Sequence, residues 1–261
     1  MGLSLCDTIW LSDKRKNLLL LLMEGPRSIE QIKTSLNVTS KAMMPQIKIL
    51  KKQGLVLHKD GTYTLSDIGK LIIGNMLPLL NTLEVIEENK EYWASRETDI
   101  IPNELFMRLG ELRECRVIEP DLNHLFDLPR EFTENLIRSK CIMSSISYYH
   151  PLYSSLYSKL AKNEVEMEIV FTKAVFERLK DDCREDLNAL LNSKKTIIKI
   201  FDDSLQLPTI AVTEKFMYLC LFDKQEKYDH RVVMSFDLSA IRWGRELFMY
   251  YKKLSRENTK I

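Results

Sequence analysis

Five lysines and no acidic residue lie between residues 39 and 59. They are Lys41, Lys48, Lys51, Lys52 and Lys59. Ammonium groups gathered without carboxylates suit the neutralisation of nucleic-acid phosphates. Residues 1–65 hold ten Lys/Arg and five Asp/Glu, a net +5, whereas the whole chain is +1, so residues 66–261 total −4. This asymmetry predicts a DNA-binding N-terminal region attached to a nearly neutral body; a solvated basic face is the alternative.

A second group of reactive side chains follows an expected strand in the C-terminal half. Residues 144–153 concentrate hydroxyls, aromatic rings and a histidine, and Thr172 ends the next expected strand. Ligands of open α/β sheets sit beyond the carboxyl ends of strands. The pattern predicts a pocket for a small polar or anionic molecule, lined by Tyr148, Tyr149, His150, Tyr153 and Thr172. The alternative is an aromatic core beside an ordinary helix cap.

Catalytic and metal-binding patterns are not found. The four histidines, at 58, 124, 150 and 230, are far apart, and no HExxH, GxSxG, GxGxxG or GxxxxGK[ST] occurs. The five cysteines form neither CxxC nor CxC, so buried free thiols are expected. We therefore expect no enzymatic activity, no cofactor and no metal, while a metal site or cysteine cluster assembled by folding stays open.

The lysine-rich stretch must be positioned by two helices. Ser28 and Gln31 match a capping box that starts the first helix. Residues 37–40 break the helical period and offer N-cap side chains. In the second helix, apolar residues at spacings of four and three define one buried face: Met43, Ile47 and Leu50.

A β-hairpin is expected directly after these helices. Gly54 suits a helix C-terminus, and Asp60-Gly61 separates two short apolar runs at 55–58 and 62–65. A helix-turn-helix followed by a hairpin is the winged-helix pattern, whose second helix enters the DNA major groove. An upstream helix capped near residues 12–13 and stopped at 25–26 would complete the domain.

The second helix has few side chains that read base edges. Pro45 indicates that the regular helix begins near residues 44–45 or that its first turn is distorted. Gln46 is the best candidate to hydrogen-bond a base. We therefore expect phosphate anchoring to dominate, with modest base readout and a steep salt dependence.

A long helix from Asp67 to about Trp93 is expected to follow the hairpin. Its apolar seam has heptad spacing: Ile72, Met76, Leu79, Leu83 and Ile86. Pro78 should bend or divide the helix. The seam predicts a homodimer, with packing on the same domain as the alternative.

Beyond a polar segment at 95–103, the period changes to that of an α/β domain with a mixed sheet. Strands are expected at 115–118, 141–147, 166–171, 196–200, 209–212, 216–222 and 232–235. Helices are expected at 129–139, 152–161, 174–179, 184–191 and 238–254. The predicted organisation, α+β with an α/β C-terminal half, is a winged helix at 1–66, a helical linker at 67–100, and an α/β domain at 101–261.

Composition predicts a globular protein of the cytoplasm. Hydrophobic residues make up 45% and charged residues 29% of the chain. No apolar run approaches the roughly 20 residues that span a bilayer, and no signal-peptide layout is seen. No membrane partner is expected.

Several segments together resemble a family of archaeal regulators typical of methanogens. The similar segments are residues 7–26, 43–56, 63–70, 91–105, 115–122, 132–140, 150–153, 234–240 and 242–251. The family joins an ArsR-like winged-helix domain to a C-terminal domain like that of the methanogen filament-regulator proteins. The resemblance implies a homodimeric transcription factor whose C-terminal domain, similar to a phospholipase-D-type α/β fold, senses a small molecule.

Two departures limit what the resemblance implies. Phospholipase-D enzymes need an HxK motif, and metal-sensing ArsR regulators need a CxC box; both are missing. A phosphodiesterase-like C-terminal domain or a protein-interaction role is the alternative function. The DNA-binding residues that the resemblance implies are Ser40, Lys41, Gln46, Lys48, His58 and Lys59.

Overall fold

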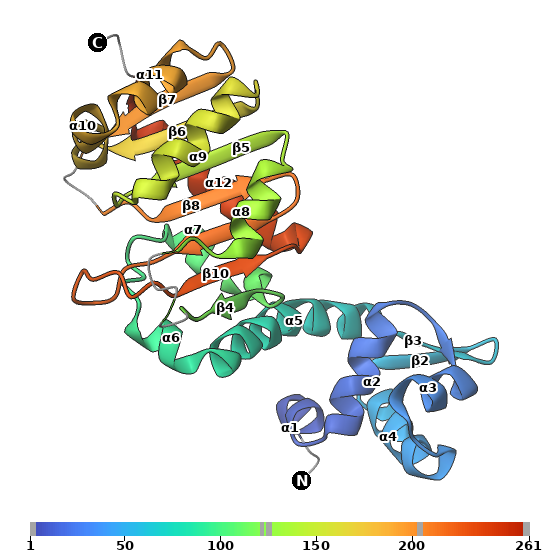
Figure 1. The fold of residues 1–261 in the computed structure, drawn as a ribbon. Helices are drawn as coiled ribbons and strands as arrows, with labels where there is room; N and C mark the ends of the chain where they lie inside the picture. Colours follow the sequence, from blue (N-terminus) through green and yellow to red (C-terminus); the bar gives the residue numbers. More distant parts are fainter. Residues whose placement is uncertain (1–3, 121–122, 124–126, 203–205, 258–261) are drawn as a thin grey trace. The chain divides into compact units, whose positions relative to one another are not determined.

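The computed structural model describes residues 4–120, 123, 127–202 and 206–257. Its contacts divide the chain into two compact units, residues 1–80 and 81–261. The elements of each unit are labelled in Figure 1. His124, one of the four histidines noted in the sequence, lies outside the described residues.

Four helices and a small sheet form the first unit. The helices are α1 (Leu5–Trp10), α2 (Asp13–Met23), α3 (Ile29–Leu36) and α4 (Ser40–Lys52). The capping box of α3 is present, with Ser28 and Gln31 bonded reciprocally. Asn37 ends α3 in the left-handed conformation, and Thr39 caps α4 through the N–H of Ala42. These local bonds set the sharp turn between the two helices.

The small sheet has the order β1-β3-β2. Its strands are β1 (Arg27–Ser28), β2 (Val56–Lys59) and β3 (Thr62–Leu65). Asp60 and Gly61 both have positive φ, 50° and 74°, which the tight turn of a two-residue hairpin requires. One core joins the hairpin to the helices, and Met43, Ile47 and Leu50 are fully buried in it as predicted. The unit is a helix-turn-helix followed by a wing.

Helix α5 (Asp67–Glu88) continues through Pro78, so Pro78 does not divide it, and a bend there stays a prediction. The helical segment instead breaks at Asn89, before α6 (Lys90–Ser95). Ile73 and Met76 belong to the core of the first unit, and Val85 to a core of the second. The segment 67–100 is therefore shared between the two units, whereas the sequence predicted a separate linker.

The second unit is built on a mixed sheet. Among the described residues its strand order is β11-β7-β6-β5-β8-β9-β10-β4. The strands are β4 (Arg116–Ile118), β5 (Cys141–Ile146), β6 (Glu166–Thr172), β7 (Thr196–Phe201), β8 (Thr209–Thr213), β9 (Met217–Cys220), β10 (Val232–Ser235) and β11 (Arg256–Glu257). The pairs β5–β6 and β6–β7 are parallel, and the remaining pairs are antiparallel. The predicted mixed sheet is present.

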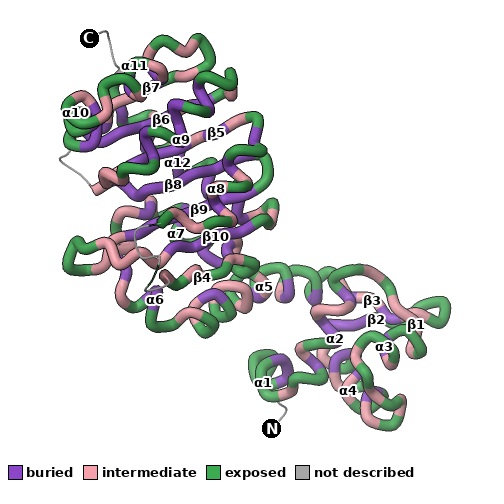
Figure 2. The backbone as a smooth tube through the Cα atoms, in the orientation of Figure 1, coloured by how far each residue is buried: buried purple, intermediate pink, exposed green. Residues whose placement is uncertain are grey.

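Helices cover both faces of this sheet (Figure 1). They are α7 (Asn103–Phe106), the 3-10 helix η1 (Leu109–Leu112), α8 (Arg130–Ile137), α9 (Pro151–Lys162), α10 (Lys173–Asp182), α11 (Arg184–Asn192) and α12 (Leu238–Leu254). Alternate strand residues enter opposite cores: Val232 and Met234 pack with α8 to α11, and Val233 packs with α12. Strands β8, β9 and β10 are accordingly buried along their whole length (Figure 2).

Arg96, just after α6, is fully buried. Its guanidinium forms a two-pronged salt bridge with Asp229, 2.9 Å from Nη1 to Oδ1, and donates to the carbonyl of Leu221 at 3.2 Å. It also lies 4.4 Å from the ring centre of Tyr92. Burial alone would raise the pKa of Asp229, but hydrogen bonds from Arg96 and Arg231 outweigh it and lower that pKa to about 2. The pair fixes the loop between β9 and β10.

Removal of this carboxylate is expected to destabilise the second unit. Asp229→Ala leaves the buried guanidinium of Arg96 without a counter-charge, which should lower the free energy of unfolding by about 3–5 kcal/mol. Urea unfolding followed by tryptophan fluorescence measures this, because Trp93 and Trp243 are both buried in the second unit. The control is Glu134→Ala, which removes a partner of the exposed Arg130 and should leave the free energy of unfolding nearly unchanged.

The difference in free energy of unfolding between wild type and Asp229→Ala depends on pH in a defined way. The folded-state pKa of Asp229 lies below its ordinary value of 3.8, so its contribution is fully present above pH 4. It is lost as the pH falls towards 2, and the difference between wild type and Asp229→Ala should shrink over that range. A difference that stays constant from pH 6 to pH 2 would contradict the assigned ion pair.

Candidate functional site

An exposed, lysine-lined hollow of about 610 Å³ lies on α4. Its lining consists of Lys41, Met44, Pro45, Ile47, Lys48, Lys51 and Tyr63. Lys41 and Lys48 lie one above the other at this surface because seven residues make two helical turns. No carboxylate belongs to the lining. The geometry presents positive charge beside an apolar floor that Met44 and Tyr63 form, with the Tyr63 hydroxyl 3.9 Å from the Met44 sulfur.

Pro45 lies inside α4, which begins at Ser40. Of the two alternatives for Pro45, a helix that begins near residues 44–45 is therefore wrong, and a distorted first turn stays a prediction. Ser40 is the first helical residue and is half-buried. The amide groups of Ala42 and Met43 in the first turn donate to the side chain and the carbonyl of Thr39.

Gln46 does not extend freely from α4. Its Oε1 accepts a hydrogen bond of 2.9 Å from Nη1 of Arg15, whose side chain is buried. Arg15 also donates to the carbonyl of Thr8, so it joins α4 to α1 and α2. This contact assigns Gln46 a role in positioning α4 and argues against the predicted base contact. Sequence reasoning missed Arg15 because its partner is 31 residues away.

The wing carries the two remaining expected DNA-binding residues. His58 and Lys59 lie at the end of β2 and are exposed. The His58 ring stacks on Tyr63, with 4.4 Å between centroids. Tyr63 thus contacts both His58 and Met44, which places the wing and the lysine-lined hollow on one continuous surface.

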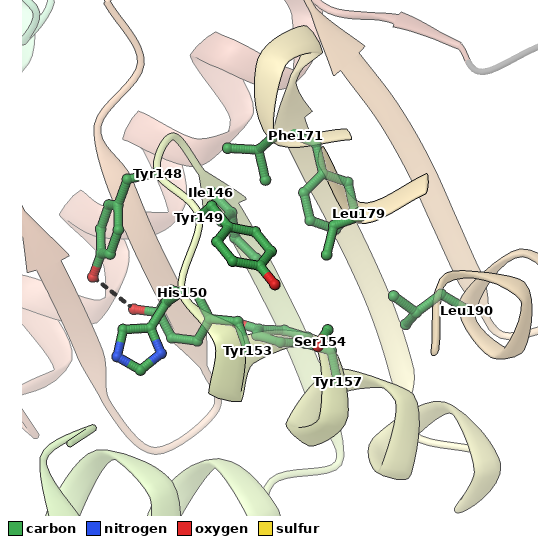
Figure 3. Close-up of a pocket in the computed structure, with 11 residues that line it drawn as sticks. Ile146, Tyr148, Tyr149, His150, Tyr153, Ser154, Tyr157, Phe171, Leu179 and Leu190 are labelled. Atoms are coloured by element: carbon green, nitrogen blue, oxygen red, sulfur yellow. Dashed lines mark hydrogen bonds between the residues drawn. The ribbon is translucent and has the colours of Figure 1, made fainter. Parts of the chain in front are cut away.

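The pocket expected in the second unit is filled. Tyr148, Tyr149, His150 and Tyr153 do come together (Figure 3), but the space they enclose is about 10 Å³, enough for one water at most. The hydroxyls of Tyr148 and Tyr153 are 3.0 Å apart and hydrogen-bonded. The aromatic-core alternative therefore describes this space better than a ligand pocket does.

Thr172 is not among the residues that line this space. Its Oγ1 accepts from the N–H of Val175 at 3.3 Å, so it caps α10 as expected from its position after a strand. Tyr149 is engaged with Cys183, 3.4 Å from its hydroxyl, a contact that raises the pKa of Tyr149 to about 12.

A larger hollow adjoins the filled space. It measures about 750 Å³ and shares Tyr148 and His150 with it. Strand β4, the residues before α8, Tyr218, and the loop between β9 and β10 supply the rest of the lining, including Arg116, Glu119, Asp127, Arg130, Glu131, Tyr228 and His230. This hollow is not evident from the sequence, because its walls come from segments about 110 residues apart that are joined by the pairing of β4 with β10.

The other residues with reactive side chains remain dispersed. All five cysteines are free; Cys220 is buried, Cys6 is exposed and three are intermediate, so the expectation of buried thiols holds only in part. Burial raises the pKa of the Cys220 thiol to about 11. No group of three metal-ligating side chains occurs within the described ranges. None of the helices in the described part of the chain has the length and apolar content needed to cross a membrane.

Comparisons with known proteins match both units. The N-terminal domain model of "Methanogenesis regulatory protein FilR1" matches residues 8–85, and the middle domain model of the same protein matches residues 125–254. The protein of that name from Methanothrix harundinacea (strain 6Ac) is 23% identical over 251 residues. The match covers 94% of this chain but only 56% of the relative. The chain therefore spans little more than half the length of this relative.

Two solved structures are more remote. TrmBL2, described as an archaeal chromatin protein, is 14% identical and covers 94% of both chains with a TM-score of 0.44. The quinone-bound YodB from B. subtilis is 19% identical, covers 34% of this chain and 90% of its own, and has a TM-score of 0.24. At these TM-scores neither structure adds to the interpretation of this chain.

The contact between Arg15 and Gln46 can be tested by a single substitution. Gln46→Leu removes the acceptor from a buried guanidinium and should lower the free energy of unfolding by about 1–3 kcal/mol, measured by calorimetry on the full chain. Lys52→Leu, at an exposed position on the same helix, should change it by less than about 0.5 kcal/mol. A Gln46→Leu protein that keeps its stability and loses its DNA sequence preference would instead assign Gln46 to base reading.

Proposed function

We propose that the chain is a homodimeric, DNA-binding transcriptional regulator whose second unit senses a small molecule. The matches to the N-terminal and middle domains of a regulatory protein support the regulatory role. The single observation on which the proposal rests is the lysine-lined surface of α4 within a winged helix. An archaeal source is part of the proposal, and the relative from Methanothrix harundinacea supports it.

The DNA-binding surface is proposed to comprise α4 and the wing. In helix-turn-helix proteins the second helix enters the major groove, and here that helix exposes Lys41, Lys48 and Lys51. Lys59 adds a further positive charge at the end of β2, and His58 is exposed beside it. Lysines act on phosphates as point charges and carry little sequence information. We therefore expect strong, salt-sensitive binding, with specificity that depends on DNA shape and on the spacing of two half-sites.

The dimer is proposed to form through α5. This helix exposes large apolar side chains on one face: Ile68 is 59% exposed, Leu71 67%, Leu79 51% and Leu83 42%. At about 100° per residue these four positions fall within roughly a third of the helix circumference. The exposed apolar face therefore differs from the predicted seam. Met76 of the seam packs into the core of the first unit, whereas Ile68 and Leu71, which were not part of the seam, belong to the exposed face. A second copy of α5 is the occupant that would cover this face and pair two α4 helices.

Charge reversal on α4 tests DNA binding. Lys41→Glu/Lys48→Glu should weaken binding to a labelled duplex by about 100-fold or more in fluorescence anisotropy, because two attractions to phosphate become repulsions. The slope of log K against log salt should also become shallower, by about 0.9 for each phosphate that the substituted side chains no longer neutralise.

The matched control for the charge reversal is Lys159→Glu/Lys162→Glu. These lysines are exposed on α9 of the second unit, and the pair makes the same change in net charge. It should leave affinity within about threefold of wild type. Equal reductions in affinity in the two double variants would overturn the assignment of α4 and leave only a general charge effect.

Lysines placed on the exposed face of α5 test the dimer. Leu79→Lys/Leu83→Lys would bury two ammonium groups per chain in the proposed interface, and sedimentation velocity should then show a monomer. Leu238→Lys/Leu254→Lys is the control, because both leucines are exposed on α12 and lie outside the proposed interface. A Leu79→Lys/Leu83→Lys protein that sediments as a dimer would place the interface elsewhere.

A further inference from the structure

Two apolar side chains lie among the lysines on the exposed face of α4. Met44 is 45% exposed, Pro45 is exposed, and both line the 610 Å³ hollow. Residues three and four positions apart are neighbours on a helix surface, so Met44 lies between Lys41 and Lys48. The second helix therefore carries an apolar strip, Met44 and Pro45, with an ammonium group on either side.

The exposed face of α4 has few side chains that read base edges by hydrogen bonding. Every residue of α4 is described, and among them Gln46 is the only asparagine, glutamine or arginine. Its Oε1 is already bound to Arg15, and Ser40 is half-buried. Lysine donates to guanine or to a phosphate, but it has neither an acceptor for the adenine amino group nor an apolar end for the thymine methyl group. Recognition of A·T pairs by this face therefore depends mainly on the apolar strip.

The charge around the apolar strip limits what can cover it. Between residues 39 and 59 there are five lysines and no acidic residue, so the same face of a second copy of this chain would be repelled. The occupant must be a polyanion that presents apolar groups between its charges. Double-stranded DNA does so in its major groove, where the 5-methyl groups of thymine lie between two rows of phosphates. A winged helix places its second helix in that groove.

Met44 is held in place by the wing. The Tyr63 hydroxyl lies 3.9 Å from its sulfur, and the Tyr63 ring, itself buried, stacks on His58 of β2. A methionine side chain that is already ordered loses less conformational entropy when it contacts a partner. The thioether is also polarisable and adapts to irregular apolar surfaces. Met44 is thus suited to contact a methyl group at the floor of a groove.

Pro45 has no evident role in the stability of the first unit. Proline has no backbone N–H, so it cannot donate to the carbonyl of Lys41, four residues earlier, as other residues of a helix would. Its ring is exposed and does not belong to the core. A residue that is unfavourable in a helix interior and adds nothing to the core is accounted for by a role at the surface. The rigid ring beside Met44 extends the apolar strip without the entropy cost of a flexible side chain.

We propose that Met44 and Pro45 are the specificity-determining residues of α4 and that they recognise thymine through its 5-methyl group. The lysines on either side neutralise the phosphates, and the apolar strip lies against the base edges between them. The preferred DNA therefore carries thymine at the positions that face α4 in the major groove. This inference deepens the proposed DNA-binding function and rests on it, and it adds a direct base contact to the readout of DNA shape.

Uracil in place of thymine tests the proposal, because it removes the 5-methyl group and keeps the base-pairing atoms. The probe is the duplex that the full chain selects from a pool of random duplexes, with affinity measured by fluorescence anisotropy. At the thymines that face α4, a single dT→dU substitution should weaken binding about fourfold, the effect of returning one methyl group to water. At thymines elsewhere in the same duplex, the substitution should leave the affinity unchanged.

Variants of Met44 locate the contact. In Met44→Ala the loss of affinity on dT→dU should disappear, because the side chain that contacts the methyl group is gone. Met44→Leu keeps an apolar side chain of similar size and should retain the loss. Met23→Ala, at the exposed end of α2 and outside the hollow, is the matched control and should also retain it. Circular dichroism checks that each variant is folded.

Salt dependence separates this contact from phosphate anchoring. Met44 is uncharged, so Met44→Ala should weaken binding by the same factor at every salt concentration and leave the slope of log K against log salt unchanged. Lys41→Glu/Lys48→Glu, in contrast, should change that slope. A changed slope in Met44→Ala would show that the lysines have moved and would overturn the direct contact.

Duplex binding and methyl dependence are separate readouts. A wild-type chain that binds duplex DNA without dependence on any thymine methyl group would overturn the proposed readout and leave the DNA-binding function intact. An equal loss on dT→dU in wild type and in Met44→Ala would overturn the assignment to Met44. Failure of the chain to bind any duplex would overturn the DNA-binding function itself.

Discussion

A guanidinium with no exposed surface is the constraint around which the second unit is organised. Water would solvate Arg96 far better than an apolar core does, so its burial requires a full set of partners. Asp229 supplies the counter-charge, and the carbonyl of Leu221 and the ring of Tyr92 complete the shell. These partners come from α6 and from the connection of β9 to β10, more than a hundred residues apart. The loop that carries Tyr228 and His230 is held in place by the ion pair between Asp229 and Arg96.

Elements with strong local signals could be predicted from the sequence. The capping box at Ser28, the Asp60-Gly61 turn and the buried face of α4 depend on residues within a few positions of each other. The longer strands and helices of the second unit were also predicted, because their apolar periods are uninterrupted. The short helices α1, α7 and η1, and the edge strands β1 and β11, were not predicted, since two to six residues carry too little periodicity.

Features that depend on contacts between distant residues could not be predicted. The polar segment that contains Arg96 was predicted to be a domain boundary. Its polar residues are evident from the sequence, whereas the contact between Arg96 and the distant carboxylate of Asp229 is not. Gln46 was predicted to contact a base, because the sequence does not reveal that Arg15, on another helix, binds its side chain. For the larger hollow, Tyr148 and His150 were identified, but most of the remaining lining comes from β4, the start of α8 and the β9–β10 connection. Whether a cluster of tyrosines is a pocket or a core depends on space, which packing alone decides.

The alternation along Tyr228, Asp229 and His230 has a consequence for how such a protein changes over generations. Tyr228 and His230 line the hollow, whereas the residue between them holds the fold together. Substitutions at the two outer positions would change the surface of the hollow, whereas loss of the middle carboxylate would leave a buried guanidinium without its counter-charge. The cost of variation to the fold therefore differs sharply between neighbouring residues of one loop.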